Sequence, residues 1–125
     1  MLATVHEKVW GFEMWIVNTE KYCGKRLILN KGWRCSMHHH KKKDETFYVD
    51  HGIVLFETAS QDLSRTQQQT LRPGESIHVE PGVWHRFSGI EDAVIFEFST
   101  HHDDADSYRR EPSGRMPANG VGVTV

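Results

Sequence analysis

The sequence predicts a single all-β domain, built as a sandwich or barrel of short strands. Its 125 residues are the length of one ordinary domain. Aromatic and β-branched residues gather in short runs, a composition typical of strands. Clusters of Gly, Pro, Asn and Asp separate these runs, and no segment keeps a long helical period. Many short strands divided by such turns favour a sandwich or a barrel.

The strand signal is confined to short segments, and they are 9–17, 26–29, 46–49, 53–56, 76–79 and 93–98. Residues 57–66 fit either a short helix or a hairpin loop. From about residue 111 the chain is rich in Gly and Pro and builds no apolar face. We therefore expect a barrel over residues 1–110. Residues 111–125 are expected to form a mobile tail, or an arm that orders against a partner in a dimer.

Charge and hydropathy exclude several classes of partner. The formal net charge is −2, so the chain lacks the positive field of a nucleic-acid-binding domain. No apolar run approaches the roughly 20 residues of a membrane span, and the N-terminus lacks the apolar core of a secretory signal. Cys23 and Cys35 are too few for a disulfide scaffold. We therefore expect free thiols, a reducing compartment and a cytoplasmic protein.

The nine histidines point to metal binding, and three of them are consecutive. If His38 and His40 share a strand, the period of two puts both imidazoles on one face. Glu45 follows after a short basic turn and can reach the same point from the start of the next strand. Two imidazoles and a carboxylate suit a divalent first-row metal and leave positions for water or substrate. A fourth ligand must come from elsewhere, and His85, after a Pro-Gly turn, offers it.

This spacing resembles the cupin superfamily. The first cupin motif reads Gly, five residues, His-x-His, three or four residues, Glu, six residues, Gly. Every fixed position of that motif is met, by Gly32, His38, His40, Glu45 and Gly52. The resemblance implies a jelly-roll β-barrel with a metal inside it, held by His38, His40, Glu45 and His85. Manganese, iron, cobalt, nickel and zinc all suit such a set of ligands.

The second cupin motif is matched with two departures. The spacing from Gly74 to His85 agrees with the motif, although its Pro-Gly element is compressed. Gly89 stands where an Asn is frequent. Neither departure removes a metal ligand, so both motifs together cover residues 32–89.

Two further stretches resemble the D-lyxose ketol-isomerase group and the cupin domains of sialic acid synthases. They are residues 17–29, and residues 96–100 together with 103–109. The resemblance implies a metal-dependent sugar isomerase or epimerase that acts on an aldose or ketose through an enediol. By position, it implies Lys25 and Glu97 as catalytic residues that flank the substrate. It also implies Arg109 as a residue that holds the sugar.

These residue types suit the chemistry. Aldose–ketose isomerisation moves a proton between C1 and C2, a metal can stabilise the enediolate charge, and a carboxylate can carry the proton. A lysine ammonium can donate to a sugar oxygen. Around Glu97, alternation places Ile95, Glu97 and Ser99 on one face, so this carboxylate can face the barrel. Trp84, next to His85, can stack against the sugar as a wall of its pocket.

Other interpretations stay open at this point. Lys25 also fits a solvated strand end, Glu97 fits an outward charge on an edge strand, and residues 41–43 fit a solvated basic turn. A second possible function is a cupin module that binds a sugar without turning it over. A third is an iron-dependent dioxygenase, because two or three histidines and a glutamate also hold iron in such enzymes. The aromatic strand at 9–17 and an open barrel edge favour a homodimer.

Overall fold

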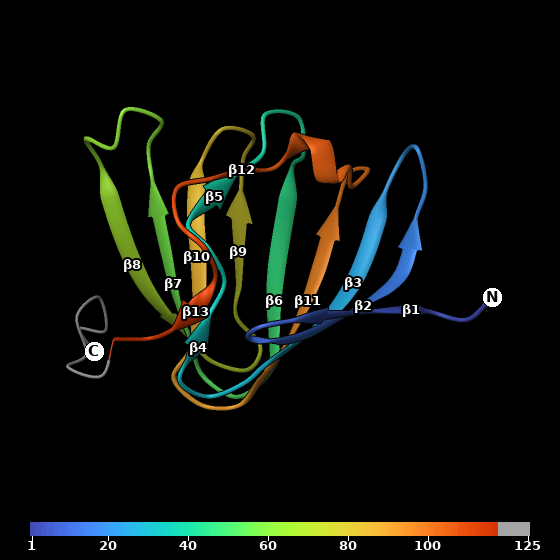
Figure 1. Ribbon diagram of the computed structural model, residues 1–125, viewed down its shortest axis with the longest axis horizontal. Coiled ribbons are helices and arrows are strands. Elements are labelled where there is room, and N and C mark those ends of the chain that lie inside the picture. Colours follow the sequence, from blue (N-terminus) through green and yellow to red (C-terminus); the bar gives the residue numbers. More distant parts are fainter. Residues whose placement is uncertain (118–125) are drawn as a thin grey trace.

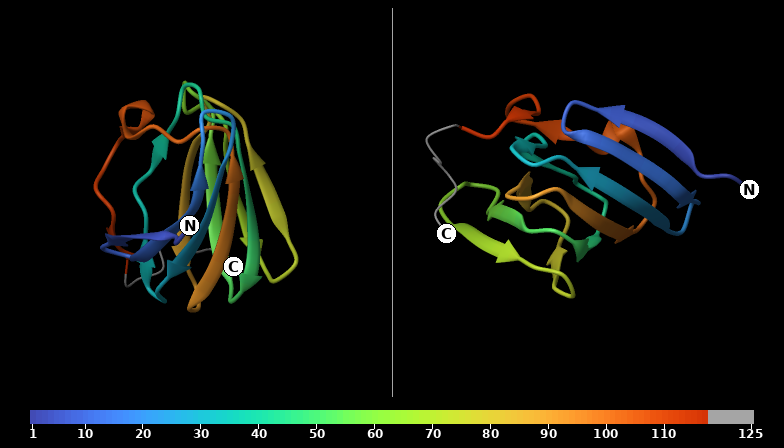
Figure 2. Two further views of the ribbon diagram at one scale, coloured as in Figure 1. Left: turned by 90° about the vertical axis from the view of Figure 1, so that its right-hand side faces the viewer. Right: turned by 90° about the horizontal axis from the view of Figure 1, so that it is seen from below.

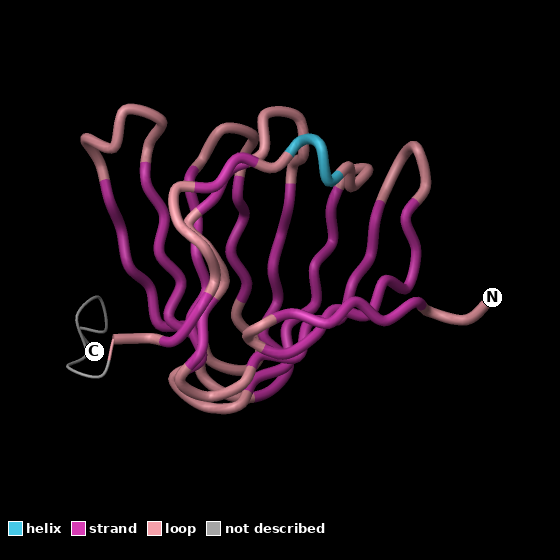
Figure 3. Tube along the Cα trace, in the orientation of Figure 1, coloured by secondary structure: helices cyan, strands magenta, loops and turns pink. Residues whose placement is uncertain are grey.

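The computed structural model describes residues 1–117, which form short strands joined by turns (Figure 1). The strands are β1 (Thr4–Lys8), β2 (Gly11–Asn18), β3 (Cys23–Leu29), β4 (Trp33–Arg34), β5 (His38–His39), β6 (Glu45–His51), β7 (Val54–Ala59), β8 (Thr66–Leu71), β9 (Ser76–Val79), β10 (Trp84–Gly89), β11 (Ala93–Ser99), β12 (Tyr108–Arg109) and β13 (Gly114–Arg115). One 3-10 turn, η1 (Asp104–Asp106), is the helical element of these residues (Figure 3). Within the same residues, no helix has the length and apolarity to cross a membrane. The predicted all-β class is confirmed.

Two antiparallel sheets lie face to face (Figure 2). One sheet has the order β1-β2-β3-β11-β6-β9. The other has the order β12-β5-β10-β4-β13, with β7 paired to β10 and β8 paired to β7. Strands distant in sequence are therefore neighbours, such as β3 beside β11 and β5 beside β10. This is the jelly-roll arrangement that the resemblance implied.

Period-two alternation sends every second side chain between the sheets. In β3 the alternate residues from Cys23 to Leu29 are buried, and in β6 those from Glu45 to Val49 are buried. Toward one end of these strands the inward side chains are apolar, and Phe47 packs on Phe56 and Phe87 with ring centroids 5.3 and 6.0 Å away. Toward the other end they are charged. The core and the candidate site therefore occupy opposite ends of the same barrel.

Gly52, the last position of the first motif, is required by the backbone. Its φ is +81°, in the left-handed region that L-residues avoid. A Cβ at this position would overlap the backbone oxygen of Asp92. The turn that leads from β6 into β7 thus admits only glycine, which explains why this residue type stands here.

The predicted strands coincide with β2, β3, β6, β7, β9 and β11. Residues 57–66 form the end of β7, a turn and the start of β8, so they are a hairpin loop and not a helix. Strands β1, β8 and β10 lacked a strand signal in the sequence. Residues 114–115, in the segment expected to be a tail, pair with β4 of the same chain. Residues 118–125 of that segment lie outside the described residues.

Candidate metal centre and cavity

Three histidine side chains meet between the two sheets. His38 begins β5, His40 follows that strand, and His85 lies on β10, where it pairs with His38 across the ladder. One ring nitrogen of each histidine lies within 4.8 Å of the other two. The structure therefore brings together all three histidines that the two motifs predicted.

Each of these imidazoles is held by a backbone carbonyl. The acceptors of the Nδ1 protons are Ser36 O for His38 at 2.7 Å, Asp106 O for His40 at 2.7 Å and Val83 O for His85 at 3.0 Å. Because a carbonyl oxygen only accepts, the proton of each neutral ring sits on Nδ1. In the neutral form of each ring, Nε2 is then left with a lone pair, which is the state that a metal ligand requires.

Glu45, at the start of β6, completes the group. Its Oε2 lies 3.1 Å from His85 Nε2, and its Oε1 lies 3.7 Å from His40 Nε2. Within residues 1–117, Glu45 Oε2 and His85 Nε2 are buried atoms without a hydrogen-bond partner. Buried polar atoms rarely stay unpaired. A cation among these nitrogen and oxygen atoms would satisfy both, so the residues present fit a divalent metal.

The pKa values of the candidate ligands favour their metal-binding forms. Burial lowers the pKa of His38 well below its usual value and also lowers that of His40, so both rings are neutral near pH 7. Burial alone would raise the pKa of Glu45. The facing His85 and the Lys43 ammonium outweigh it, so the pKa of Glu45 is lowered and the carboxylate is ionised.

A cavity of about 510 Å³ adjoins these residues. This volume lies within the roughly 300–1,000 Å³ that is typical of small-molecule sites. His38, His40 and Glu45 contribute to its lining. So do Lys25, Glu97 and Arg109, which the sequence predicted. The barrel therefore places the candidate catalytic residues beside the candidate metal ligands.

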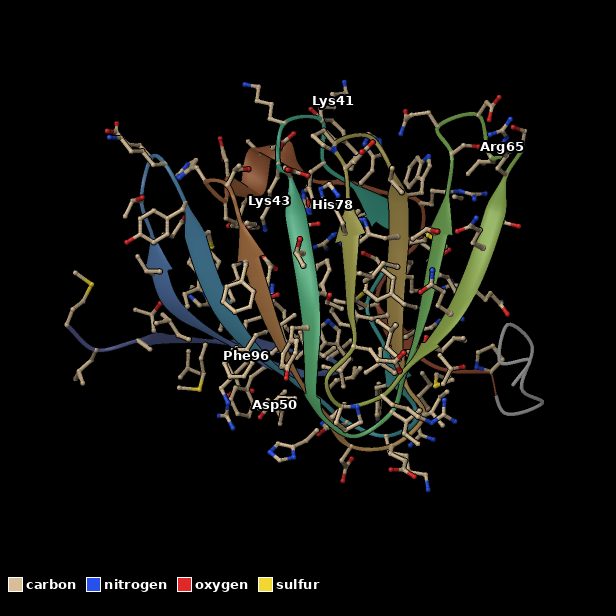
Figure 4. The ribbon with its side chains drawn as sticks, turned by 180° about the vertical axis from the view of Figure 1, so that it is seen from behind. Lys41, Lys43, Asp50, Arg65, His78 and Phe96 are labelled. Atoms are coloured by element: carbon tan, nitrogen blue, oxygen red, sulfur yellow. The ribbon has the colours of Figure 1, made fainter. Side chains whose placement is uncertain are left out.

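Lys43 was the least expected residue of the site. Lys41 and Lys42 are exposed, as a solvated turn requires, but the side chain of Lys43 is only 2% exposed. Figure 4 shows Lys41 at the outer end of the loop before β6 and Lys43 lower, near the strand ends. The interpretation of residues 41–43 as a wholly solvated turn is therefore wrong for Lys43.

The Lys43 ammonium has three donors and uses all of them. Nζ lies 2.6 Å from Glu97 Oε2, 3.1 Å from Glu45 Oε1 and 2.8 Å from His102 Nδ1. Burial alone would lower the pKa of Lys43, but the two carboxylates raise it above its usual value. A permanent buried cation thus ties a candidate metal ligand to a candidate base.

Glu97 lies on β11 with its side chain inside the barrel. The predicted alternation is confirmed, because Ile95 and Glu97 are buried while Phe98 is 57% exposed. Oε2 of Glu97 accepts hydrogen bonds from Lys43 and from the Ser99 hydroxyl, the latter at 3.0 Å. Oε1 has no hydrogen-bond partner within residues 1–117. One oxygen is therefore fixed and the other is available to a molecule in the cavity.

Lys25 is also buried, with 2% of its surface exposed, so it is not a solvated strand end. It lies opposite Glu97 in the pairing of β3 with β11. Its Nζ contacts Glu13 Oε1 at 3.3 Å and lies 4.4 Å from the centre of the Trp15 ring. Lys25 and Glu97 thus both line the cavity, and each has a different ion-pair partner.

Trp84 and Arg109 differ in their relation to the cavity. Trp84 precedes His85 on β10, so its side chain lies on the opposite face of that strand. Its ring packs edge-on against His39 at 4.4 Å, and Trp84 is not among the described residues that line the cavity. Arg109 lies on the short strand β12, pairs with His38 and does line it.

Asp106 fixes the loop that carries Lys43. Its carboxylate accepts the backbone N–H groups of Lys41, Lys42 and Lys43 at 2.8, 3.1 and 3.2 Å. Its carbonyl accepts the Nδ1 proton of His40. Asp106 therefore orients residues of the site without facing the cavity.

Comparison with known proteins agrees with this geometry. Residues 25–100 match the cupin domain family. The chain is 31% identical to the D-lyxose/D-mannose isomerase of Thermosediminibacter oceani, over 77% of this chain and 65% of the relative. It is 30% identical to the D-lyxose ketol-isomerase of Cohnella laeviribosi, over 81% of this chain and 68% of the relative. The chain therefore spans about two thirds of the length of these curated relatives.

A solved structure shares the fold. The capsular polysaccharide assembling protein CapF of Staphylococcus aureus superposes with a TM-score of 0.79 at 17% identity, over 89% of this chain and 32% of that chain. At this identity the likeness concerns the fold alone. The family match covers more than half of the chain and includes all four candidate metal ligands. The chain belongs to the cupin family.

Proposed function

We infer that this chain is a metal-dependent sugar isomerase that interconverts an aldose and a ketose through an enediol. One observation carries the proposal. Glu97 lines the cavity with one oxygen free among the described residues, while Lys43 ties its other oxygen to the candidate metal ligand Glu45. The two relatives named as isomerases of D-lyxose support the same reaction class.

In the proposed reaction, Glu97 Oε1 takes the proton from C2 of the aldose. The electrons of that C–H bond form the C1–C2 double bond, and the C1 carbonyl oxygen becomes the enediolate oxygen. Glu97 then returns its proton to C1, and the C2 hydroxyl proton passes to the C1 oxygen, which leaves a ketose of the same formula. A bound divalent metal would supply positive charge that stabilises the enediolate oxygens.

The two buried lysines take different roles in this proposal. Lys43 has all three donors engaged by protein atoms, so it holds the carboxylates and not the sugar. Lys25 has one hydrogen bond, to Glu13, among the described residues. Its remaining donors can therefore bind a sugar oxygen, and Arg109 can bind a hydroxyl group from β12. The sequence contains no P-loop motif, and we therefore propose a sugar without a phosphate group.

A second candidate function is a sugar-binding cupin that does not turn its ligand over. It is supported by the cavity beside the candidate metal ligands, which could hold a sugar with or without turnover. A dioxygenase is less well supported, because iron–oxygen chemistry has no need of the Lys43–Glu97 pair. A homodimer and a cytoplasmic location stay predictions. Size-exclusion chromatography tests the dimer, and a clean 14.5 kDa monomer would contradict it.

The proposal is tested by proton exchange into the sugar. The protein is loaded with manganese or cobalt and placed in D₂O with lyxose, xylulose, mannose or fructose, and with a phosphorylated sugar for comparison. NMR follows deuterium that enters at C1 or C2. We expect exchange with at least one of the free sugars and conversion of aldose to ketose.

Two variants identify the base. Glu97→Gln should abolish exchange while the protein still binds metal, and Glu91→Gln, an exposed glutamate just before β11, serves as the matched control. Exchange that persists in Glu97→Gln would remove Glu97 from the reaction. The absence of exchange with every sugar in the metal-loaded wild type would favour the sugar-binding module. Oxygen consumption with iron would then test the dioxygenase.

A further inference from the structure

His102 is a buried residue of the site that the motifs did not predict. It follows β11, lines the cavity, and its side chain is 10% exposed. Its backbone is fixed by the Asn18 side chain, which accepts the His102 N–H at 2.9 Å and donates to the His102 carbonyl at 3.0 Å. The ring is therefore anchored in place.

Both ring nitrogens of His102 face charged groups. Nδ1 lies 2.8 Å from Lys43 Nζ, and Nε2 lies 2.7 Å from Asp104 Oδ1. An ammonium only donates and a carboxylate only accepts. The contacts thus specify a neutral ring with its proton on Nε2 and a lone pair on Nδ1. Burial and the Lys43 charge also lower the pKa of His102, which favours the neutral ring.

This tautomer is the opposite of that in the candidate metal ligands, where Nδ1 carries the proton. Because Lys43 occupies the Nδ1 lone pair, and because His102 lies outside the three-histidine group, His102 does not belong to the metal-binding set. Its two nitrogens are both engaged by protein, so it also does not bind the sugar. The contact of His102 that affects the site is the one with Lys43. Without it, the third N–H of the Lys43 ammonium would be buried without an acceptor.

We propose that His102 is a positioning residue that accepts the third proton of Lys43 and so directs the ammonium at Glu45 and Glu97 together. The ammonium in turn holds Oε2 of Glu97, which leaves Oε1 facing the cavity. Asp104 completes the arrangement, because it fixes the His102 proton on Nε2 and keeps Nδ1 as an acceptor. The effect on turnover rests on the proposed isomerase function, whereas the tautomer does not.

The first experiment reads the tautomer without any turnover. The full chain, labelled with ¹⁵N-histidine, is studied by long-range ¹H–¹⁵N NMR in its metal-free and zinc-loaded forms at pH 7, and His102→Asn identifies the His102 signals. We expect a protonated Nε2 and an unprotonated Nδ1 in both forms. A proton on Nδ1, or a doubly protonated ring, would overturn the proposal whether or not the protein is an isomerase.

The second experiment tests whether the acceptor atom of His102 or only the volume of its side chain matters. His102→Leu removes the acceptor, whereas His102→Asn offers a side-chain oxygen near the position of Nδ1. We expect His102→Leu to lower the kcat for proton exchange by about 10- to 100-fold, the usual range for groups that orient a site. KM and bound metal should stay unchanged, and His102→Asn should recover most of the activity.

The neighbouring exposed His101 gives the control variant His101→Leu, which should keep the wild-type rate. Wild-type kcat in His102→Leu would overturn the proposal. So would equal losses in the Leu and Asn variants, because shape and not the acceptor would then matter. If the wild type shows no exchange at all, the proposed function fails and the tautomer measurement alone decides the role of His102.

Discussion

Replacing Lys43 by methionine keeps most of the buried side-chain volume and removes the ammonium between Glu45 and Glu97. In the metal-free protein, this change leaves two carboxylates buried near each other without a cation of their own. Breaking a buried ion pair on one side is among the costly substitutions known in proteins, because the remaining charge is uncompensated. The experiment therefore tests the ammonium that contacts both the candidate metal ligand Glu45 and the proposed base Glu97.

The size of the effect follows from the distances. At an effective dielectric constant of about 20, the ammonium attracts Glu97 at 2.6 Å by about 6 kcal/mol and Glu45 at 3.1 Å by about 5 kcal/mol. Desolvation of the ammonium offsets several kcal/mol of this. The variant can also let one carboxylate take up a proton, which costs about 3.4 kcal/mol at pH 7 from an ordinary pKa of 4.5. We therefore expect a loss of about 3–4 kcal/mol at pH 7.

The loss should depend on pH with a definite sign. The stranded carboxylate has a raised pKa in the folded variant, so the folded state binds more protons than the unfolded state above pH 4.5. The contribution of this carboxylate to the variant's stability is then greatest at acid pH and falls as the pH rises. Relative to wild type, the penalty should shrink by about 1.4 kcal/mol for each pH unit between 7 and 5.

The assay is urea unfolding of the metal-free proteins at pH 5, 6 and 7, followed by circular dichroism. Lys42→Met is the matched control, because Lys42 is exposed in the same run of lysines and should lose less than about 0.5 kcal/mol. A Lys43→Met stability within 1 kcal/mol of wild type at pH 7 would refute the reasoning. A loss that stays constant down to pH 5 would refute its electrostatic part.

Four further outcomes are expected. His85→Gln should lower the affinity for cobalt by at least about 100-fold in equilibrium dialysis, since a direct ligand matters at least as much as the groups that orient it. Burial raises the pKa of Cys35 to about 12, so iodoacetamide should leave this thiol unmodified in the folded protein up to pH 9 and alkylate it in urea. Gly52→Ala should cost about 2–4 kcal/mol in urea unfolding, through its positive φ and its contact with a backbone oxygen. Backbone N–H groups outweigh burial and lower the pKa of Asp106, so Asp106→Asn should destabilise the protein at pH 7, and the difference should disappear as wild-type Asp106 protonates below pH 3.8.

Three of the four candidate metal ligands were predictable because their spacing is local. His38 and His40 are two residues apart, and alternation along an extended segment is enough to put them on one face. Glu45 needs only a short turn to return to the same point. His85 is distant in sequence, and it was found through the spacing of the second motif and not through any strand signal in β10.

The burial of Lys43 was not predicted, because its neighbours in the sequence are also lysines. A run of three lysines has the composition of a solvated turn, and nothing in that composition separates its third member. Alternation did offer a signal, because Lys43 lies two residues before Glu45 and therefore on the same face of an extended chain. The Lys43 ammonium is paired with Glu97, which lies on β11. Only the sheet topology places β11 beside β6, the strand that follows Lys43.

The direction of the Trp84 side chain could not be predicted, because the sequence shows no strand signal over β10. Residues 84–89 carry polar and aromatic side chains without a clear alternation, so no strand was predicted over them. Once β10 is known, His85 and Trp84 must point to opposite faces, and His85 is the one that joins the three-histidine group. The partner of Lys25 was equally out of reach, because Glu13 comes from β2 across a ladder whose register shifts between Trp15 and Val17.

The charge count of the site links its stability to its proposed chemistry. Glu45 and Glu97 share the single ammonium of Lys43, so these three side chains carry one net negative charge, and burial keeps the adjoining His38 and His40 neutral. A net charge in a barrel interior is costly unless an opposite charge joins it. Among the described residues the other buried cation, Lys25, is paired with Glu13. This imbalance favours the binding of a cation at the point where His38, His40, His85 and Glu45 converge.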